Sequence, residues 1–262
     1  MRNNITNTRK KLDLKDMRIL YELDTNARQP CSKIAKKVGL SKEGVNYRIK
    51  QLEKQGIITY YQLITNLSKL GIIQFKICLL LQHISSKNLN SIIEKLKENN
   101  AVKWIVSCRG NWDLIISLEA DSIKEVDSLK NKILTLFLGF IYKKAVSILI
   151  DAEVFNRVYF LDKKSFREGK TILDTSQKIK IDEIDLRILK KLSENARKPI
   201  VELASELKLS IRTISYRIKQ LIKNKLISGF KIAIDYQKLG ILFFKCFIYL
   251  DNLKEEREKQ LI

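Results

Sequence analysis

Two segments of the chain carry basic and hydrogen-bonding side chains at a spacing suited to contact with a polyanion. Residues 42–54 and 211–223 each follow a serine that can cap a helix, and each contains the run Tyr-Arg-Ile-Lys-Gln-Leu. At 100° per residue, with Val45 turned toward the core, the outer side of each helix carries polar and charged groups. These are Glu43, Tyr47, Lys50 and Lys54 in the first segment and Arg212, Tyr216, Lys219 and Lys223 in the second.

The residue types on these faces suit the chemistry of duplex DNA. Lysine holds phosphates, whereas asparagine can make two bonds to adenine, arginine can make two to guanine, and glutamate can accept one from cytosine. We therefore predict that DNA is contacted by residues at the start and along the outer face of each helix. They are Ser41, Lys42, Glu43, Asn46, Tyr47, Arg48, Lys50 and Lys54, together with Ser210, Arg212, Thr213, Ser215, Tyr216, Arg217, Lys219 and Lys223.

The same residues also have structural interpretations. A lysine-rich helix face is often only solvated, and the tyrosine of each helix could serve packing. Arg48 and Arg217 lie beside the apolar stripe, where they could pair with Asp16 and Asp185. The second segment carries no acidic residue, whereas the first carries two glutamates, so we predict tighter and more salt-dependent DNA binding by the second.

The composition also favours a polyanionic partner. The chain has 262 residues, with 50 Lys and Arg against 29 Asp and Glu, for a net charge of +21. Such a charge concentrates nucleic acid or an anionic membrane surface around the protein. No stretch reaches the roughly 18 apolar residues that a membrane-spanning helix needs. The basic N-terminus lacks the apolar segment of a secretory signal.

Few residues could serve metal or redox chemistry. The four cysteines, at 31, 78, 108 and 246, are far apart, and none forms a CxxC pair. We interpret them as reduced thiols of a cytoplasmic protein. His83 is the single histidine, so a His/Cys zinc site would lack ligands, and we expect no metal or other cofactor.

The chain contains a tandem repeat. The stretch that begins at Asp13 reappears 169 residues later at Asp182 and keeps its register through Leu81 and Leu250. Over these 69 positions, 28 residues are identical. A shared bias toward helix-forming residues would not hold register for so long, so each copy should fold in the same way. The second copy stops early, so either the sequence is a fragment or this copy has lost most of its C-terminal half.

Local patterns within the first copy predict a winged helix-turn-helix. Helical spacing of apolar residues predicts a helix at 13–24, a second from Pro30 with Gly39 as its stop, and a third from Ser41 to about Gln55. The β-branched and aromatic run 57–64 then predicts a strand or wing. In this motif the last helix enters the DNA major groove.

The remainder of the first copy changes to a β-α-β-β-α-β order. Apolar runs predict strands at 72–81, 102–108, 112–118 and 142–150, with amphipathic helices at 89–96 and 123–138. This order is that of the ferredoxin-like fold. The fold class is therefore α+β: two winged helix-turn-helix domains, one ferredoxin-like (βαββαβ) domain and the start of a second.

These patterns divide the chain into five expected segments. Residues 152–180 have no clear period and are expected to form a linker with some helix. In the second copy, a strand is expected at 241–250 and a helix from 255. The segments are 12–67 (winged domain), 70–151 (ferredoxin-like effector and oligomerisation domain), 152–180 (linker), 181–236 (second winged domain) and 237–262 (incomplete second ferredoxin-like domain).

These residues resemble the Lrp/AsnC family of transcription regulators, especially its archaeal forms. The resemblance rests on Asn26-Ala-Arg, on residues 34–41 and 45–58, and on the loop Gly110-Asn-Trp-Asp113. It covers 12–151 as a whole unit and 181–262 as a partial second one. The chain departs from the family pattern by carrying two winged domains and a shortened second sensor half.

The resemblance implies an effector and an assembly. In that family the ferredoxin-like domain pairs subunits through its sheet and often binds an amino acid near a Gly-x-x-Asp loop. By resemblance, Gly110, Trp112 and Asp113 would lie at such a site, although the loop could equally be a β-turn with a capping aspartate. A homodimer or higher homo-oligomer is expected.

Three functions remain open at this point. The first is a sequence-specific transcription regulator that binds double-stranded DNA and is not an enzyme. The second is a weakly specific architectural DNA-binding protein. The third is a decarboxylase, because sirohaem decarboxylases also resemble this architecture, but they would need histidines around a tetrapyrrole and this chain has one.

Overall fold

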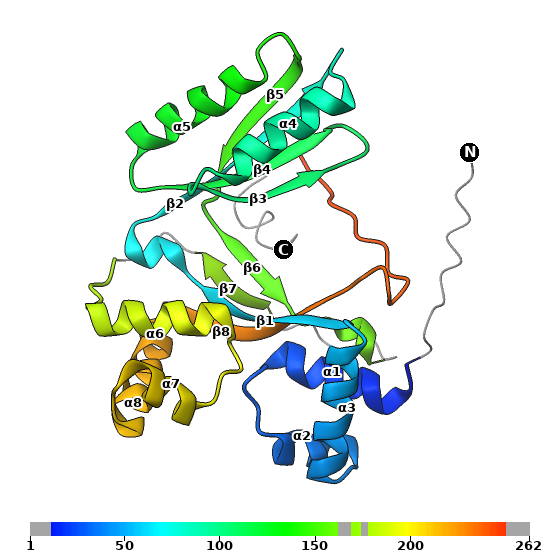
Figure 1. The fold of residues 1–262 in the computed structure, drawn as a ribbon, viewed down its shortest axis with the longest axis vertical. Helices are drawn as coiled ribbons and strands as arrows, with labels where there is room; N and C mark the ends of the chain where they lie inside the picture. Colours follow the sequence, from blue (N-terminus) through cyan, green and yellow to red (C-terminus); the bar gives the residue numbers. More distant parts are fainter. Residues whose placement is uncertain (1–11, 162–168, 174–177, 250–262) are drawn as a thin grey trace.

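The computed structural model describes residues 12–161, 169–173 and 178–249. Two helical units lie at one end of the molecule and a sheet with two helices at the other (Figure 1). The helical units are the two copies of the repeat, and they share one continuous hydrophobic core. The sheet and its helices have a second core of their own. Within these described residues, no helix has the length and apolarity needed to cross a bilayer.

The first copy contains three helices, as its apolar spacing predicts. They are α1 (Leu14–Thr25), α2 (Cys31–Val38) and α3 (Lys42–Lys54). The Asp13 carboxylate caps α1 by accepting from the Asp16 backbone N–H. Helix α2 ends at Gly39, whose φ of 66° lies in the left-handed region that glycine enters without steric cost.

The second copy repeats this arrangement with α6 (Glu183–Glu194), α7 (Ile200–Leu207) and α8 (Ile211–Lys223). Asp182 and Asp185 form a reciprocal capping box at the start of α6. The position equivalent to Gly39 is Lys208, which adopts a φ of 56° despite its side chain. The second copy therefore keeps the backbone of the turn without the residue that suits it best.

The strand that follows the helices in each copy pairs with the other copy. Strand β1 (Ile58–Thr65) runs antiparallel to β8 (Ile227–Ile234), and the two form their own two-stranded sheet. Gln62 pairs with its own repeat equivalent, Lys231, and pairs on either side are reciprocal. The two copies are thus related by a local two-fold axis that passes through this ribbon.

Reciprocal contacts hold the copies together beyond the ribbon. The Arg28 guanidinium donates to the carbonyls of Ala196 and Lys198, at 2.7 and 2.9 Å. Arg197, its repeat equivalent, donates to the carbonyls of Ala27 and Gln29. Burial, together with the nearby Arg197 charge, lowers the pKa of Arg28. The same contact is therefore made twice within one chain, once from each copy.

The upper domain confirms the expected ferredoxin-like order. It contains β2 (Ile73–Leu81), α4 (Ser86–Lys97), β3 (Val102–Ser107), β4 (Leu114–Ala120), α5 (Ile123–Leu136) and β5 (Ile141–Ile148). All neighbouring strands are antiparallel, in the order β3-β4-β2-β5. Helices α4 and α5 cover one face of the sheet, and their apolar sides pack on Phe75, Ile77 and Leu79.

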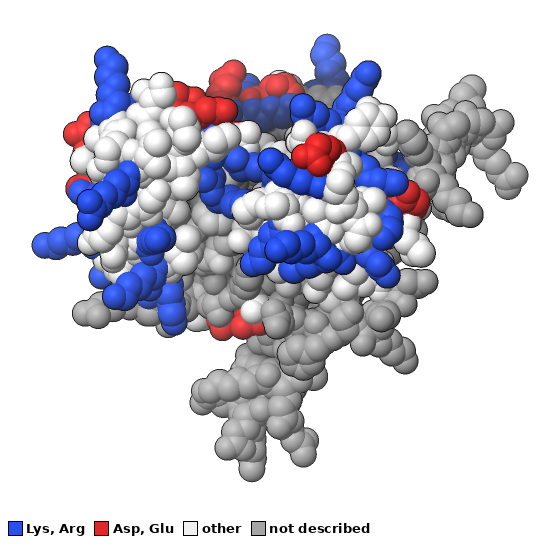
Figure 2. All heavy atoms as spheres, turned by 90° about the horizontal axis from the view of Figure 1, so that it is seen from below, with Lys and Arg blue, Asp and Glu red and all other residues white. Residues whose placement is uncertain are grey.

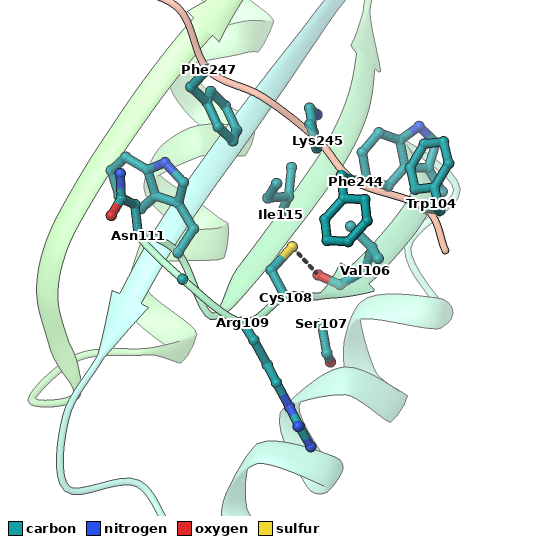
Figure 3. Close-up of a pocket in the computed structure, with 13 residues that line it drawn as sticks. Trp104, Val106, Ser107, Cys108, Arg109, Asn111, Ile115, Phe244, Lys245 and Phe247 are labelled. Atoms are coloured by element: carbon teal, nitrogen blue, oxygen red, sulfur yellow. Dashed lines mark hydrogen bonds between the residues drawn. The ribbon is translucent and has the colours of Figure 1, made fainter. Parts of the chain in front are cut away.

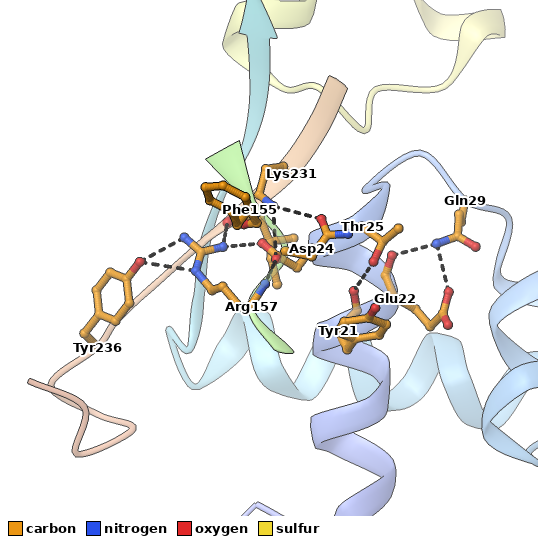
Figure 4. A network of polar contacts seen from close by, with 11 residues as sticks. Tyr21, Glu22, Asp24, Thr25, Gln29, Phe155, Arg157, Lys231 and Tyr236 are labelled. Atoms are coloured by element: carbon orange, nitrogen blue, oxygen red, sulfur yellow. Dashed lines mark hydrogen bonds and ion pairs between the residues drawn. The ribbon is translucent and has the colours of Figure 1, made fainter. Parts of the chain in front are cut away.

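The expectation of a linker with some helix at 152–180 is wrong for much of this segment. Strands β6 (Ala152–Phe155) and β7 (Gly169–Leu173) pair antiparallel, and a single 3₁₀ turn spans Val158–Phe160. Polar contacts explain this order, because they anchor the segment to both copies: Arg157 bonds to Asp24 of the first copy and to Tyr236 of the second. Asp24, fully buried at the end of α1, accepts from Arg157 and from Lys231, the latter at 3.1 Å (Figure 4). We call these three residues the Asp24 cluster.

The strand expected at 241–250 is also absent from the part of it that the structure describes. Residues 241–249 are extended but belong to no sheet, and Leu242, Phe243 and Phe244 are exposed. Their equivalents in β2 are flanked by β4 and β5, whereas no strand of the described residues pairs with 241–249. An apolar strand sequence without neighbours to bond has no ladder to join. The helix expected from 255 lies outside the described residues.

Candidate nucleic-acid interface

Helices α3 and α8 begin with equivalent caps. The Ser41 hydroxyl accepts from the Gly44 backbone N–H at 3.0 Å, and the Ser210 hydroxyl accepts from Thr213 at the same distance. The hydroxyls of Ser210 and Thr213 also lie 2.8 Å apart. These serines and the threonine were predicted to contact DNA, and the structure shows them stabilising the helix starts.

The predicted outer faces are exposed in both copies. Three apolar residues of each helix are buried in the shared core: Val45, Ile49 and Leu52 in α3, and Ile214, Ile218 and Leu221 in α8. Tyr47 is 65% exposed and Tyr216 is 59% exposed, so neither tyrosine packs inside the fold. The remaining predicted contacts are also exposed, except that Ser215 is half-buried: Lys42, Glu43, Asn46, Lys50 and Lys54 in α3, and Arg212, Lys219 and Lys223 in α8.

Arg48 and Arg217 take the structural alternative. Arg48 pairs with Asp13 and Asp16 at 2.7 and 2.8 Å, and Arg217 pairs with Asp182 at 2.6 Å. Hydrogen bonding to Asp16, and then to Asp13, raises the pKa of Arg48. Both arginines thus tie the third helix of their copy, α3 or α8, to its first helix. They therefore add less to the free positive surface than the sequence alone suggests.

Positive charge gathers on the face that presents both copies. Figure 2 shows this face from below, with lysine and arginine side chains spread over two lobes and a hollow between them. Exposed lysines of α2 add to the positive surface of the first copy: Lys33 and Lys36 lie outside the buried side of that helix. In helix-turn-helix proteins this helix crosses the DNA backbone. Sequence reasoning missed these lysines, although the face opposite Ile34 and Val38 would have revealed them.

Helix α7, which matches α2 in the second copy, is acidic where α2 is basic. Helix α7 carries Glu202 and Glu206 and no basic residue. Glu206 pairs with Lys198 at 2.6 Å and with Lys191 at 3.0 Å, and these hydrogen bonds lower its pKa. In the first copy, α2 is basic and α3 carries both charges. In the second copy, α7 is acidic and the exposed face of α8 is basic.

A pocket lies next to the Gly110 loop, on the sheet face that the helices leave open. Its volume is about 800 Å³, and its walls come from β3, the loop 108–112 and the extended segment 241–249 (Figure 3). Gly110 and Trp112 line it, as predicted, but Asp113 does not. The Asp113 carboxylate instead accepts from the Leu81 backbone N–H at 2.8 Å, which is the turn-capping alternative.

Polar and aromatic groups meet in this pocket. Trp112 is buried, and within the described residues its indole N–H has no hydrogen-bond partner. Lys245 lies over the Trp104 ring at 5.4 Å, and Arg109 and Asn111 contribute polar side chains to the walls. An apolar concave surface with a few polar groups is typical of small-molecule sites.

Comparison with known proteins identifies the family. Residues 12–59 match the winged helix-turn-helix DNA-binding model, and residues 181–222 match the AsnC-type helix-turn-helix domain. A proline dehydrogenase transcriptional activator of Rhodobacter capsulatus is 33% identical over 115 residues, which are 44% of this chain and 75% of that protein. The chain belongs to the Lrp/AsnC family. The HTH-type transcriptional regulator LrpA of Pyrococcus horikoshii is 34% identical over 123 residues, 47% of this Lrp/AsnC protein and 86% of the relative.

The Lrp/AsnC protein is therefore a DNA-binding transcription regulator, and the tandem copies seen in its sequence both match helix-turn-helix domains. Its fold extends to an enzyme as well. The crystal structure of the sirohaem decarboxylase NirDL covers 84% of this chain and 65% of its own, with a TM-score of 0.57 and 14% identity. That likeness is one of fold. His83, the single histidine, is exposed on the turn after β2 and does not line the pocket.

Proposed function

We propose that this regulator reads DNA sequence in the major groove with α3 and α8 together. The observation that carries the proposal is the reciprocal β1–β8 ribbon, which holds two exposed, equivalent helix faces in one fixed relation. Lys50 and Lys219 occupy matching positions on these faces and would hold phosphates. Base contacts would come from the first turns, where Asn46 and Arg212 are positioned to meet base edges.

Selection of bound fragments from a random duplex pool by the full chain tests this proposal. A Lys50→Gln/Lys219→Gln variant should weaken binding to every sequence and lower the salt slope by about two, because each lost phosphate contact removes about 0.9. The matched control is Lys87→Gln/Lys95→Gln on α4, which removes the same charge from exposed positions of the ferredoxin-like domain. Equal loss in both variants would mean that only net charge matters.

The architectural alternative predicts a different outcome. A weakly specific binder would enrich no sequence, and its affinity for the selected duplex and for a scrambled duplex would be equal at fixed salt. A specific regulator is expected to prefer its own site by a factor of about 10³ or more. The ratio between the two duplexes therefore separates these functions, whereas a single affinity does not.

We further propose that the pocket beside the Gly110 loop binds an amino-acid effector. The chemistry supports this, because an amino acid joins a carboxylate to an apolar side chain, and the pocket joins Arg109 and Lys245 to aromatic walls. The unpartnered Trp112 indole N–H offers an additional donor. Gly110 leaves room for the ligand at the loop, where a Cβ would meet no atom within 4 Å.

Intrinsic fluorescence provides the test, since the chain has two tryptophans and both line the pocket. Titration with amino acids should shift the emission of the wild-type chain, and the shift should be lost in Trp112→Phe but kept in part by Trp104→Phe. An unchanged spectrum with all twenty amino acids would remove the effector from this site.

Finally, we propose that chains assemble through the open face of the ferredoxin-like sheet. Trp104 and Val106 are large apolar residues left exposed in the single chain, and both lie on β3, on the face opposite α4 and α5. Light scattering of the full chain should give a dimer or a higher oligomer, and Val106→Lys should shift it toward the monomer. A monomer at all concentrations would contradict the assembly without affecting DNA reading.

A further inference from the structure

One chain contains what a two-fold symmetric reader obtains from two chains. The ribbon register is centred on Gln62 and Lys231, and the backbone N–H of Asn66 donates to Leu226 just as that of Asp235 donates to Ile57, at 2.9 and 3.0 Å. A homodimer repeats every side chain in both halves, so its site is palindromic. Here the two halves have separate sequences, so the same geometry is free to carry different side chains.

Within α3 and α8, the differences between the halves are concentrated at the start of the helix. Farther along, Tyr-Arg-Ile-Lys-Gln-Leu is identical in both. At the start, four matching positions differ in chemistry: in the repeat alignment Lys42 corresponds to Ile211, Glu43 to Arg212, Gly44 to Thr213, and Asn46 to Ser215. The N-terminal residues of the recognition helix are those that contact base edges in this motif. The variation therefore falls where sequence is read, and the constancy falls where the backbone is held.

The second of these pairs is the most informative. Glu43 and Arg212 are both exposed, and among the described residues neither side chain has a hydrogen bond or an ion pair. A cation in the first turn of a helix is disfavoured by the helix dipole, and α8 has no acidic residue there to compensate for Arg212. Because nothing in the described fold uses Arg212, an external anion or acceptor is the partner that its placement suits. Guanine offers two acceptors to an arginine, and cytosine offers a donor to a glutamate.

We propose that this chain recognises a non-palindromic site, whose two half-sites differ at one equivalent position. The half-site under α8 has a guanine that Arg212 contacts, and the half-site under α3 has a cytosine that Glu43 contacts. The G·C pair is thus reversed between the halves, whereas the flanking phosphates are held alike by Lys50 and Lys219. Glu43 and Arg212 are the specificity-determining residues of the pair of helices. This inference rests on the proposed reading of DNA by α3 and α8.

Three variants of the full chain test it by selection from a random duplex pool. The wild type should enrich an asymmetric site. Glu43→Arg should select guanine at that position in both halves, and Arg212→Glu should select cytosine in both. Each single variant should lose about tenfold or more on the wild-type site and regain it when the matching base pair is reversed.

The double swap Glu43→Arg/Arg212→Glu is the matched control for charge, because it leaves the composition and net charge unchanged. It should select a site with guanine in the half-site under α3 and cytosine in the half-site under α8. The bases contacted by Asn46 and Ser215 stay in their own halves and show which half is which. Both positions changed here are solvent-exposed, and circular dichroism will verify that each variant is folded.

The outcomes separate the inference from the function on which it rests. If the two half-sites bound by one chain are palindromic, or if the single variants keep the wild-type preference, the inference is overturned while DNA reading stands. If Lys50→Gln/Lys219→Gln binds as tightly as Lys87→Gln/Lys95→Gln, the reading helices do not contact DNA, and the proposed function fails first.

Discussion

The two winged copies keep the same reciprocal bonds around Arg28 and Arg197, but they differ at the first turn of their exposed third helices. Arg28 and Arg197, Ala27 and Ala196 make the same reciprocal bonds. By contrast, the first turns of α3 and α8 share no residue type between positions 42–44 and 211–213. The strands of the ribbon also differ, and only Ile58 and Ile227 are identical at matching positions of β1 and β8. Their pairing uses backbone groups, so it tolerates changes of side chain.

One buried contact breaks this symmetry. The carboxylate of the Asp24 cluster comes from the first copy only, because Ser193 occupies the equivalent position in the second. Its two cations come from elsewhere: Arg157 from the segment after β5, and Lys231 from β8 of the second copy.

Asp24→Ala should strongly destabilise the chain, by about 3–5 kcal/mol, since it leaves the buried charges of Arg157 and Lys231 without their carboxylate. Chemical denaturation measures the effect. Ser193→Ala at the equivalent position of the second copy is exposed and should change stability by less than about 0.5 kcal/mol. Similar losses of stability in the two variants would show that the Asp24 carboxylate contributes no more than the matching side chain of the second copy.

Removing charge from α8 should weaken DNA binding more than removing it from α3. The triple variant Arg212→Gln/Lys219→Gln/Lys223→Gln is expected to lose affinity by on the order of 10² near 0.1 M salt. Lys42→Gln/Lys50→Gln/Lys54→Gln should lose less, because Glu43 and Glu53 already oppose phosphate contact there. Fluorescence anisotropy at several salt concentrations compares them. A larger loss from the α3 variant would contradict this prediction. It would mean that the first copy, with its basic helix α2, contributes more to DNA affinity than the second.

Arg28→Ala and Arg197→Ala should destabilise the chain by similar amounts, about 1–3 kcal/mol each. Each removes a half-buried guanidinium and leaves carbonyl groups of the other copy without a donor. Thermal or urea unfolding of both variants gives the ratio. Clearly unequal costs would mean that the two-fold relation seen in the bonds does not extend to their energies.

Substitutions at the left-handed turn should have opposite signs in the two copies. Gly39→Ala is expected to cost about 1 kcal/mol, because its positive φ disfavours a side chain. Lys208→Gly should be neutral or stabilising by up to about 1 kcal/mol, since relief of strain outweighs the greater freedom of glycine in the unfolded chain. Urea midpoints test both. A loss of stability in Lys208→Gly would reveal a role for that lysine beyond the turn.

The helix caps should make a small, pH-dependent contribution in both copies. Backbone hydrogen bonds from Asp16 and Asp185 lower the pKa values of Asp13 and Asp182. A lowered folded pKa stabilises the protein above the usual carboxyl range near pH 4, and this stability is lost as the pH falls through the folded value. In Asp13→Asn/Asp182→Asn, urea unfolding should show reduced stability at pH 6 and a difference from wild type that shrinks toward pH 2. A difference that is constant with pH would assign the effect to packing.

Much of the local structure follows from the sequence alone. The spacing of apolar residues, the capping serines and aspartates, and the register of the repeat predicted six helices of the winged copies and the order of the ferredoxin-like domain. These features depend on neighbours within a few residues, where periodicity and capping act. The outer faces of α3 and α8 followed from the same geometry.

Only the tertiary structure showed what each element contacts at long range. In the structure β1 pairs with β8, and Arg48 and Arg217 form ion pairs. Asp113 bonds to the Leu81 backbone and does not line the pocket that Gly110 and Trp112 line. The tertiary structure also replaced an expected linker with β6 and β7, and left residues 241–249 without a sheet. Periodicity tells which side of a strand or helix is apolar. It does not tell which partner satisfies the backbone and the buried charges, because that partner comes from residues far along the chain.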